Sequence, residues 1–340
     1  MLFSIVVPMY NSERYIGDCI ESVLNQTERD FQLIIVNDGS TDACGNIADR
    51  YASMDPRIRV IHQKNEGSFH ARINGVDNAL GEYILFLDAD DKLKEFALEK
   101  IKEHTYQYEA DIFIFRADYF NSSGVVSASE KVFEDGTIFE GRKKKILYEK
   151  FTQDASLNHL WIKAIKKECF NNDIVRHYPS ILMGDDVLYT LEPLTNAKRI
   201  KYIDEVLYNY RISSTSMTKK FQPNVYQGFK TIDKIRREYL SKWELDTENY
   251  MKLLNRRVLK NISGIIMYSP TDITGKEKEF LDTLKEIQTD SYFYEIYKTS
   301  YRELSLLRKI PLFLLKKGKI NVLFYIKPIV TKLNRFKPSH

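Results

Sequence analysis

The chain has 340 residues, of which 43% are hydrophobic and 29% are charged, and its formal net charge is +4. This length and hydrophobic content support a sizeable core and exclude an intrinsically disordered protein. The three cysteines, Cys19, Cys44 and Cys169, lie far apart without a C-x-x-C pair. This spacing excludes a disulfide framework and fits a reduced cytosolic compartment.

Strand and helix signals alternate along the first 90 residues. The opening segment has no basic region and reaches Pro8 after too short an apolar run for a signal peptide, so we expect it to be the first strand. Apolar runs predict further strands, and helical patterns separate them. This βαβα order predicts an α/β domain with a doubly wound, mostly parallel sheet. The predicted strands are 4–7, 31–36, 59–62 and 83–87.

Three aspartates follow the fourth of these strands directly, in the sequence Asp88-Ala89-Asp90-Asp91. The preceding run has no polar alternation, which predicts a strand buried on both faces, and ligands bind beyond the carboxyl ends of such strands. Clustered carboxylates repel one another unless they are neutralised, and oxygen ligands suit Mg²⁺ or Mn²⁺. The alternative is a solvated acidic loop that caps the next helix, predicted from residue 94 to about 106.

The regular alternation ends after a strand at 111–115. A hairpin is predicted with its turn at 134–136, followed by a strand at 160–165 that leads to an acidic pair, Asp185-Asp186. A strand near 201–204 and the segment 208–211 close this half. Beyond about residue 221, stretches rich in Lys, Glu and Leu predict helices at 232–245 and 250–267. The sequence therefore predicts a catalytic domain at 1–220 and a helical C-terminal region at 221–340.

Five short segments occur in a fixed order along the first domain: 7–11 (VPMYN), 35–42 (IVNDGSTD), 65–67 (NEG), 71–75 (ARING) and 87–91 (LDADD). This ordered set resembles the inverting family 2 glycosyltransferases, and the resemblance spans roughly the first 215 residues. It implies a GT-A fold and a nucleotide-sugar donor. Asn37 stands where the family often has aspartate, and Ile73 interrupts the usual Ala-Arg-Asn order. We still expect nucleotide binding.

The resemblance implies a role for each matching residue in a UDP-sugar site. Pro8 and Tyr10 would lie against the uracil, and Asp38 would accept its imide N–H. Asn65 and Arg72 would complete the nucleotide pocket.

A divalent cation, Mn²⁺ or Mg²⁺, would be held on the diphosphate by the acidic segment. Asp90 resembles the main ligand of this ion, and Asp88 would lie close to the ribose and the metal. Asp91 remains a candidate supporting residue. The bound ion would offset the negative charge that develops on the departing diphosphate.

An inverting transfer also needs a base for the acceptor hydroxyl. The pair Asp185-Asp186 resembles the family's Glu-Asp motif, which implies that Asp186 is the base and Asp185 an orienting neighbour. Capping of a helix after Gly184 is the alternative. Trp161 could stack on the acceptor sugar or belong to the core. Arg211 would bind phosphate at the start of a mobile loop, 212–219.

The last segment is strongly basic: from Arg302 to Lys337 there are ten Lys or Arg residues and one acid, Glu303. Its short apolar runs are too short to span a membrane. Basic amphipathic segments of this kind bind anionic bilayers, so we expect a cytoplasmic protein that is peripheral on the inner face of the cell membrane. Packing on the catalytic domain or on a second subunit is the alternative, and a homo-oligomer stays open. No nucleic-acid-binding module is recognised.

These expectations favour an inverting transfer from a UDP-sugar to a hydroxyl of a saccharide acceptor, lipid-linked, in cell-surface polysaccharide synthesis. Two alternatives remain: transfer to a polyprenyl phosphate, and a catalytically silent scaffold that binds UDP. A nicotinamide-dependent oxidoreductase is disfavoured because no G-x-G-x-x-G follows the first strand.

Overall fold

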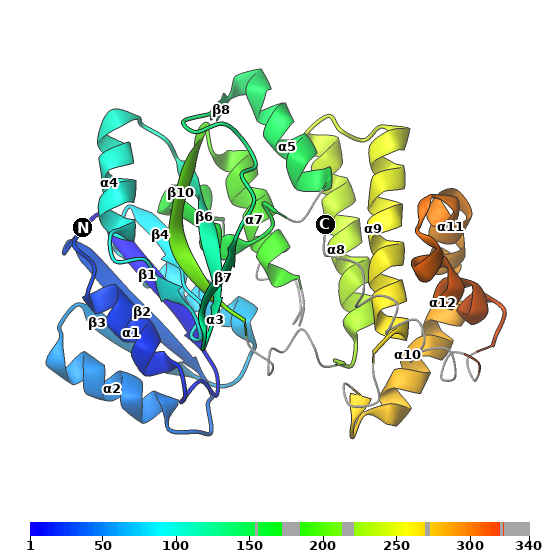
Figure 1. Ribbon diagram of the computed structural model, residues 1–340, viewed down its shortest axis with the longest axis horizontal. Helices are drawn as coiled ribbons and strands as arrows, with labels where there is room; N and C mark the ends of the chain where they lie inside the picture. Colours follow the sequence, from blue (N-terminus) through cyan, green and yellow to red (C-terminus); the bar gives the residue numbers. More distant parts are fainter. Residues whose placement is uncertain (154–155, 172–183, 213–220, 269–272, 320–321, 323–340) are drawn as a thin grey trace. The chain divides into compact units, whose positions relative to one another are not determined.

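The computed structural model describes residues 1–153, 156–171, 184–212, 221–268, 273–319 and 322. The chain divides into two compact units, Met1–Ser213 and Ser214–His340 (Figure 1). The first unit contains the sheet, and the helices described in the second unit are α8 to α12.

Among the described residues, ten strands form a sheet at the centre of the first unit. Its order is β3-β2-β1-β4-β9-β6-β10-β5, with β7 beside β6 and β8 beside β10. The neighbours β3, β2, β1 and β4 are parallel, as the alternating signals predict, whereas β9 joins β4 and β6 in the antiparallel direction. The strands are β1 Phe3–Met9, β2 Phe31–Asp38, β3 Ile58–Gln63, β4 Tyr83–Phe86, β5 Lys92–Leu93, β6 Ile112–Asn121, β7 Gly124–Ala128, β8 Ile138–Glu140, β9 Lys163–Lys166 and β10 Arg199–Arg211.

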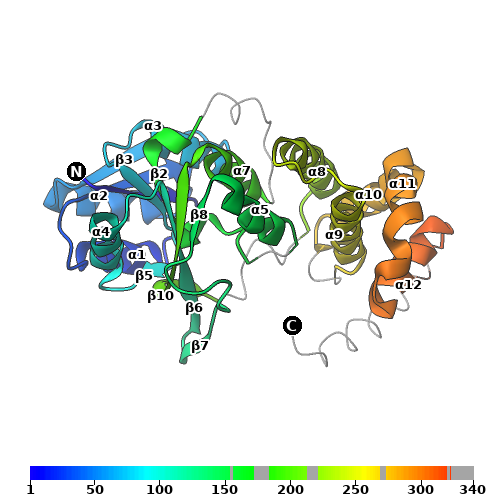
Figure 2. The same cartoon turned by 90° about the horizontal axis from the view of Figure 1, so that it is seen from above.

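Helices cover both faces of this sheet, so the residues of its central strands are buried whichever face they point to. All eight residues of β2 and all four of β4 are buried. Helices α1 and α4 lie over one face and α3 over the other (Figure 2). The helices of this unit are α1 Ile16–Leu24, α2 Cys44–Met54, α3 Ser68–Asp77, α4 Ala97–Gln107, α5 Lys144–Gln153 and α7 Asp185–Asn196.

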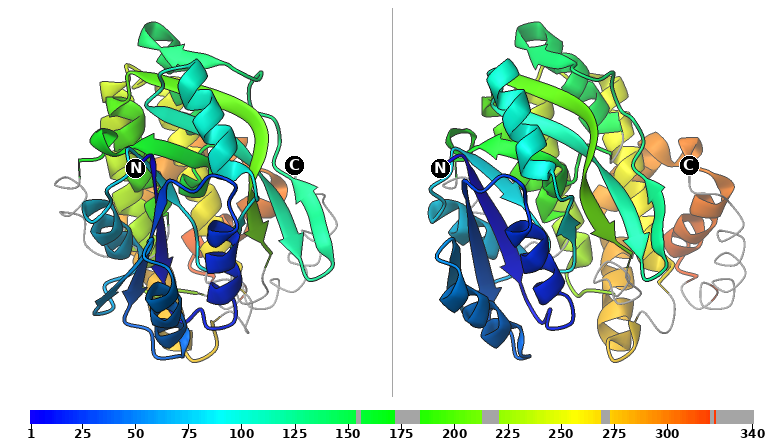
Figure 3. Two further views of the ribbon diagram at one scale, coloured as in Figure 1. Left: turned by 90° about the vertical axis from the view of Figure 1, so that its left-hand side faces the viewer. Right: turned by 60° about the vertical axis from the view of Figure 1, so that its left-hand side comes forward.

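The middle of the chain differs from the sequence-based expectation in two places. The hairpin that follows β6 turns at residues 122–123, not at 134–136, and β7 returns antiparallel to β6 (Figure 3). The turn at 134–136 leads into β8 instead, where the N–H of Gly136 bonds to the carbonyl of Tyr202. The predicted strand 160–165 begins as a 3₁₀ turn, η2 (Leu160–Ile162), before β9. Single-sequence turn signals do not reveal which of two turns closes a hairpin.

The second unit consists of α8 Val225–Lys242, α9 Glu248–Ile266, α10 Glu277–Thr289, α11 Ser291–Ser300 and α12 Leu306–Lys316. Helix α9 contacts α8, α11 and α12, and its apolar stripe of Leu254, Val258 and Ile262 is buried. Apolar residues at this spacing line one face of a helix, which accounts for its central position. The predicted helices at 232–245 and 250–267 correspond to α8 and α9.

Within the residues that the structure describes, no helix is both long and apolar enough to cross a bilayer.

Candidate active site

The carboxyl ends of the parallel strands place four of the predicted nucleotide-binding residues along one edge of the sheet. Pro8 lies near the end of β1, Tyr10 follows that strand, Asp38 ends β2, and Asn65 follows β3. Tyr10 is 46% exposed and Asn65 is exposed, so both are accessible to a ligand. This edge is the region where ligands bind in open α/β sheets.

Asp38 has a structural task at this edge. Its side chain is 3% exposed, and its carboxylate accepts hydrogen bonds from the Gln63 side chain and from the backbone N–H groups of Glu66 and Gly67, each at 2.8 Å. A carboxylate has about four acceptor positions, so one remains for a ligand. Asp38 thus fixes the segment after β3, and its contact with uracil stays a prediction.

The turn after β4 brings the acidic segment to the same edge. The backbone N–H of Asp91 bonds to the Asp88 carbonyl at 2.9 Å, which closes the turn. Asp91 is 1% exposed, and its carboxylate accepts from the Tyr208 hydroxyl at 2.7 Å and from the Arg211 backbone N–H at 2.6 Å. Asp91 therefore ties the end of β10 to the turn, while the Asp88 and Asp90 side chains remain partly exposed.

Asp88 and Asp90 have the chemistry of a divalent-cation site that is completed by a ligand. Burial raises the pKa of Asp90 to about 6, and the neighbouring Asp88 charge adds to this shift, so a positive charge is favourable here. Within the described ranges no three His, Cys, Asp or Glu side chains are grouped to hold a metal by themselves. Magnesium commonly takes one or two carboxylates and completes its shell with water and substrate phosphates, and these two oxygen donors fit that pattern.

A buried arginine connects the acidic turn to the acidic pair at the start of α7. Arg72, on α3, has a side chain that is 7% exposed. Its Nη1 lies 2.5 Å from Asp185 Oδ2, and its Nη2 lies 3.1 Å from Asp88 Oδ1 and 3.4 Å from Asp186 Oδ1. Ser68 also donates to Asp185 at 2.8 Å. One guanidinium thus places the predicted base beside the predicted metal-binding turn, although Arg72 and Asp185 are 113 positions apart in sequence.

Asp186 has a proton affinity suited to acid–base chemistry. Burial raises the pKa of its carboxyl to about 7, and the charges of Asp185 and Asp88 act in the same direction. Arg72 and a hydrogen bond from the Leu160 backbone act against this rise. A general base works best when its pKa lies near the operating pH.

Two further predicted residues lie close to this region but are engaged by the protein. The Arg211 side chain is 15% exposed, donates through Nε to the Asp90 carbonyl at 2.6 Å and pairs with Asp18 at 3.2 Å. Trp161 is 4% exposed, and its ring stacks on those of His159, Tyr208 and Tyr210, in agreement with the core alternative. The predicted mobile loop, from residue 213 onward, falls outside the described residues.

Two residues of this region were missed by reasoning from the sequence. Tyr208 is fully buried, and besides donating to Asp91 its hydroxyl accepts from the Asp88 backbone N–H at 3.2 Å. Lys163 is also buried, and its Nζ donates to the carbonyls of Leu157 and His159. A tyrosine and a lysine in strand-like sequence carry no signal of such contacts.

Comparison with known proteins identifies the family of the chain. The family model "Glycosyl transferase family 2" matches residues 4–172. GlyG, a glycosyltransferase of Streptococcus pneumoniae, is 34% identical over 226 residues, which is 64% of this chain and 73% of GlyG. EpsJ of Bacillus subtilis, an uncharacterized glycosyltransferase, is 34% identical over 218 residues; the match covers 64% of this chain and 63% of EpsJ, less than two thirds of that relative.

A solved structure shares the fold of nearly the whole chain. The structure of Staphylococcus aureus TarS residues 1–349 in complex with UDP-GlcNAc superposes with a TM-score of 0.62 at 19% identity, over 98% of this chain and 92% of the TarS chain. At this identity the likeness shows the GT-A architecture and the helices that follow it. From the family match and the identity to GlyG we conclude that this chain belongs to glycosyl transferase family 2.

Proposed function

We propose that this protein transfers a sugar from a UDP-sugar to a hydroxyl group of a saccharide acceptor, with inversion at the anomeric carbon. The observation that carries the proposal is the placement of Arg72, whose guanidinium contacts Asp88 in the acidic turn and both Asp185 and Asp186 on α7. A donor diphosphate at the turn would then lie beside a carboxylate able to accept a proton.

The donor site lies along the edge formed by β1, β2 and β3. Pro8 and Tyr10 would contact the uracil, with the free acceptor position of Asp38 directed to its imide N–H, and Asn65 at the rim. Arg72 would complete the nucleotide pocket by fixing the carboxylates that it contacts. The UDP and UDP-GlcNAc complexes of TarS support a uridine nucleotide, because that protein shares this fold.

In the reaction the acceptor oxygen forms a bond to the anomeric carbon while the bond from that carbon to the diphosphate oxygen breaks. Asp186 takes the proton of the acceptor hydroxyl, and UDP leaves with the bonding electron pair. Asp185, held by Ser68 and Arg72, orients Asp186 and the acceptor. Arg211 keeps a positive charge at the Asp90 end of the turn. A Mn²⁺ or Mg²⁺ ion on Asp90 and Asp88 would neutralise charge on the diphosphate.

The acceptor that we propose is a lipid-linked saccharide used in cell-surface polysaccharide synthesis. The protein would reach this acceptor while bound to the surface of an anionic membrane. Helix α12 supports this location. It exposes Leu306 by 71% and Phe313 by 46%, and Lys309, Lys316 and Lys317 lie on or directly after it. Apolar side chains beside lysines are the combination that binds the interface of an anionic bilayer.

The test measures UDP release and product formation with a panel of UDP-sugars, with Mn²⁺ and saccharide acceptors. We expect turnover with at least one donor, and its loss in Asp90→Ala and in Asp186→Asn. Equal turnover in all three proteins would refute the assigned roles. A product joined through phosphate would indicate a polyprenyl-phosphate acceptor, and UDP binding without any turnover would indicate a silent scaffold.

A further inference from the structure

A cavity of about 240 Å³ lies in the first unit between the β6–β7 hairpin and the segment that contains η2. The part of its lining that bears on recognition consists of Arg116, Tyr119, Glu130, His159 and Trp161. Pockets for drug-sized ligands usually have ~300–1,000 Å³. This cavity therefore suits one ring rather than an extended chain.

Aromatic rings form one wall of the cavity. Trp161 stacks on His159 with ring centroids 4.7 Å apart and on Tyr210 at 5.4 Å, and Tyr210 meets Tyr119 edge to face at 5.6 Å. Since Trp161 is nearly buried, the rings open to a ligand are those of Tyr119 and His159, both of which are only partly buried. Amphipathic rings of this kind present an apolar face and a polar edge, which matches the alternating C–H and hydroxyl surface of a pyranose.

The polar groups of the cavity favour an uncharged ligand. Arg116 is committed to the protein, since Nη1 pairs with Asp204 at 2.8 Å and Nε and Nη2 both donate to the Ser129 carbonyl. Glu130 is exposed and makes no ion pair or hydrogen bond within the part of the chain that the structure describes. The negative charge of Glu130 disfavours an anionic ligand, and its carboxylate oxygens can accept hydrogen bonds from hydroxyl groups.

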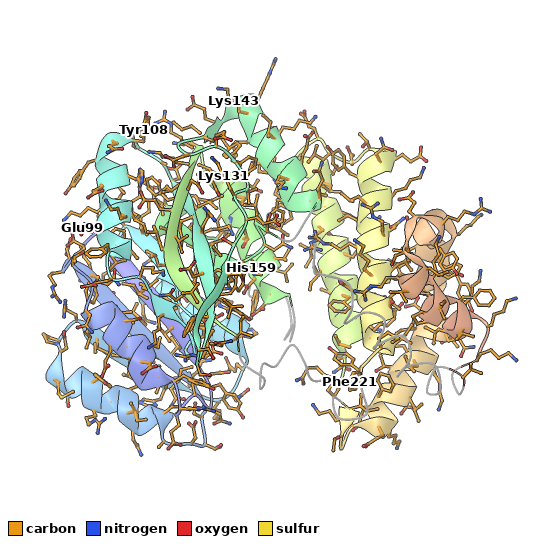
Figure 4. The ribbon with its side chains drawn as sticks, in the orientation of Figure 1. Glu99, Tyr108, Lys131, Lys143, His159 and Phe221 are labelled. Atoms are coloured by element: carbon orange, nitrogen blue, oxygen red, sulfur yellow. The ribbon has the colours of Figure 1, made fainter. Side chains whose placement is uncertain are left out.

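His159 adds a neutral polar group to the same wall. Burial lowers the pKa of its imidazole to about 4, and the Lys163 charge adds to this shift, so the ring is uncharged at neutral pH and offers one donor and one acceptor. His159 directly precedes η2. The backbone of Leu160, the first residue of η2, donates a hydrogen bond to Asp186. The cavity and the proposed base are therefore joined by a single short turn. His159 is labelled in Figure 4.

We propose that this cavity binds one neutral pyranose residue of the acceptor, with Tyr119 and His159 against the ring and Glu130 on its hydroxyl groups. The inference rests on the proposed function and deepens it, because it assigns the acceptor class and the residues that select it. An acceptor residue that carries a carboxylate or phosphate is disfavoured here.

The first experiment measures binding without any turnover. The chain has two tryptophans, Trp161 and Trp243, so the Trp243→Phe protein reports the cavity through the fluorescence of Trp161 alone. The protein is titrated with octyl glucoside, octyl galactoside or octyl N-acetylglucosaminide, with and without UDP, and we expect a saturable change of the Trp161 fluorescence with at least one of them. The affinity for octyl glucuronide should be at least tenfold weaker. No saturable change with any neutral glycoside, in protein that binds UDP, would overturn the inference.

The second experiment reverses the charge at the mouth of the cavity. In Glu130→Lys we expect the ratio of kcat/KM for octyl glucuronide to that for the best neutral glycoside to rise about tenfold. The matched control is Glu134→Lys, where the exposed carboxylate pairs with Lys131 outside the cavity. We expect its ratio to stay within twofold of wild type.

An equal shift in both variants, or no shift in Glu130→Lys, would contradict the assignment. Failure of the proposed function has a different signature. In that case wild type releases no UDP from any donor, while the fluorescence titration still decides whether the cavity binds a neutral sugar.

Discussion

Both units bury charged side chains, but the ratio of carboxylates to guanidinium groups differs between them. In the helical unit Asp233 is 3% exposed, and its Oδ2 accepts from Arg237 Nε at 2.6 Å and from the Tyr292 hydroxyl at 2.7 Å. A second edge of the Arg237 guanidinium donates to Asn255 at 2.5 Å. Asp233 forms its ion pair with Arg237 and also faces the buried Arg236, and the contacts of the pair join α8 to α9 and α11.

In the first unit one guanidinium, that of Arg72, serves three carboxylates, and Asp90 and Asp91 lie close to one of them. Burial raises the pKa of Asp90 to about 6, and the negative charge of Asp88 adds to this shift. The comparison teaches that a carboxylate surrounded by guanidinium groups holds helices together, whereas a cluster with more carboxylates than guanidinium groups favours the binding of a cation or a proton. Strongly perturbed groups of the second kind are typical of functional sites.

The largest effect is expected at the proposed base. Asp186→Asn should lower kcat for transfer by about 10³-fold, since general base catalysis contributes ~10²–10⁴-fold, and should leave the affinity for UDP within twofold. UDP release and calorimetry measure the two quantities. Asp233→Asn is the control, with normal turnover per folded molecule. A similar loss of turnover in both variants would remove the distinction between the two clusters.

The next effect is expected at the acidic turn. Asp90→Asn should abolish the gain in UDP affinity that Mn²⁺ provides and lower kcat/KM about 10²-fold, in line with the removal of one electrostatic contact to developing charge. Calorimetry with and without Mn²⁺ checks the first part. Asp282→Asn, an exposed carboxylate beside Lys285, is the control. Undiminished Mn²⁺ enhancement in Asp90→Asn would show that the cation binds elsewhere.

The pH dependence of kcat/KM further distinguishes the carboxylates around Arg72 from the Asp233–Arg237 pair. Asp186 must be ionised to accept a proton, and its pKa is raised to about 7, so kcat/KM should fall about tenfold per unit as the pH drops below 7. The charged groups that act on it are Arg72, Asp185, Asp88 and Lys163. This acidic limb should be absent from the residual activity of Asp186→Asn. An unchanged limb in that variant would assign it to another group.

Loss of the Asp233–Arg237 ion pair should lower the stability of the helical unit. Asp233→Ala leaves Arg237 without its carboxylate, which should lower the free energy of unfolding by about 2 kcal/mol. Breaking a fully buried pair costs ~3–5 kcal/mol, and we expect less here because the Arg237 side chain is 29% exposed. Urea unfolding followed by circular dichroism measures the change. A loss below about 0.5 kcal/mol would mean that the pair contributes little to the helical unit.

The smallest effect is expected on the surface of α12. Leu306→Ser should weaken binding to vesicles that contain phosphatidylglycerol by about fivefold, because part of the transfer free energy of a leucine, ~1.5–3 kcal/mol, is lost. Leu80→Ser is the matched control, since Leu80 is 72% exposed and Leu306 is 71% exposed. Vesicle sedimentation measures both. Equal weakening in the two variants would argue against α12 as the contact.

Much of the first unit could be predicted from its sequence because the signals there are local. Continuous apolar runs identify β1 to β4, and the acidic turn follows the last of them directly. The resemblance identified the family. The predicted position of the β6–β7 hairpin was wrong, because residues 121–124 (NSSG) and 134–136 (EDG) both carry turn signals and these do not show which turn closes the hairpin.

The contacts that organise the site could not be predicted, because they join distant parts of the chain. Arg72 and Asp185 are separated by 113 positions, and Tyr208 lies 117 positions from the carboxylate it holds, Asp91. Such pairs are set by the packing of α3, α7 and β10 around the sheet. Sequence reasoning found the charged groups, Arg72 among them as a nucleotide-pocket residue, but not the contacts of Arg72 with the carboxylates or the role of Tyr208.

The sharing of Arg72 has a consequence for turnover. In the reaction that we propose, Asp186 would no longer compete for the guanidinium once it had taken up a proton, and Arg72 would then interact more strongly with Asp88 and Asp185. Under that proposal, bond formation at the acceptor would change the charge beside the acidic turn. One side chain would thus link the completion of transfer to the release of the nucleotide product.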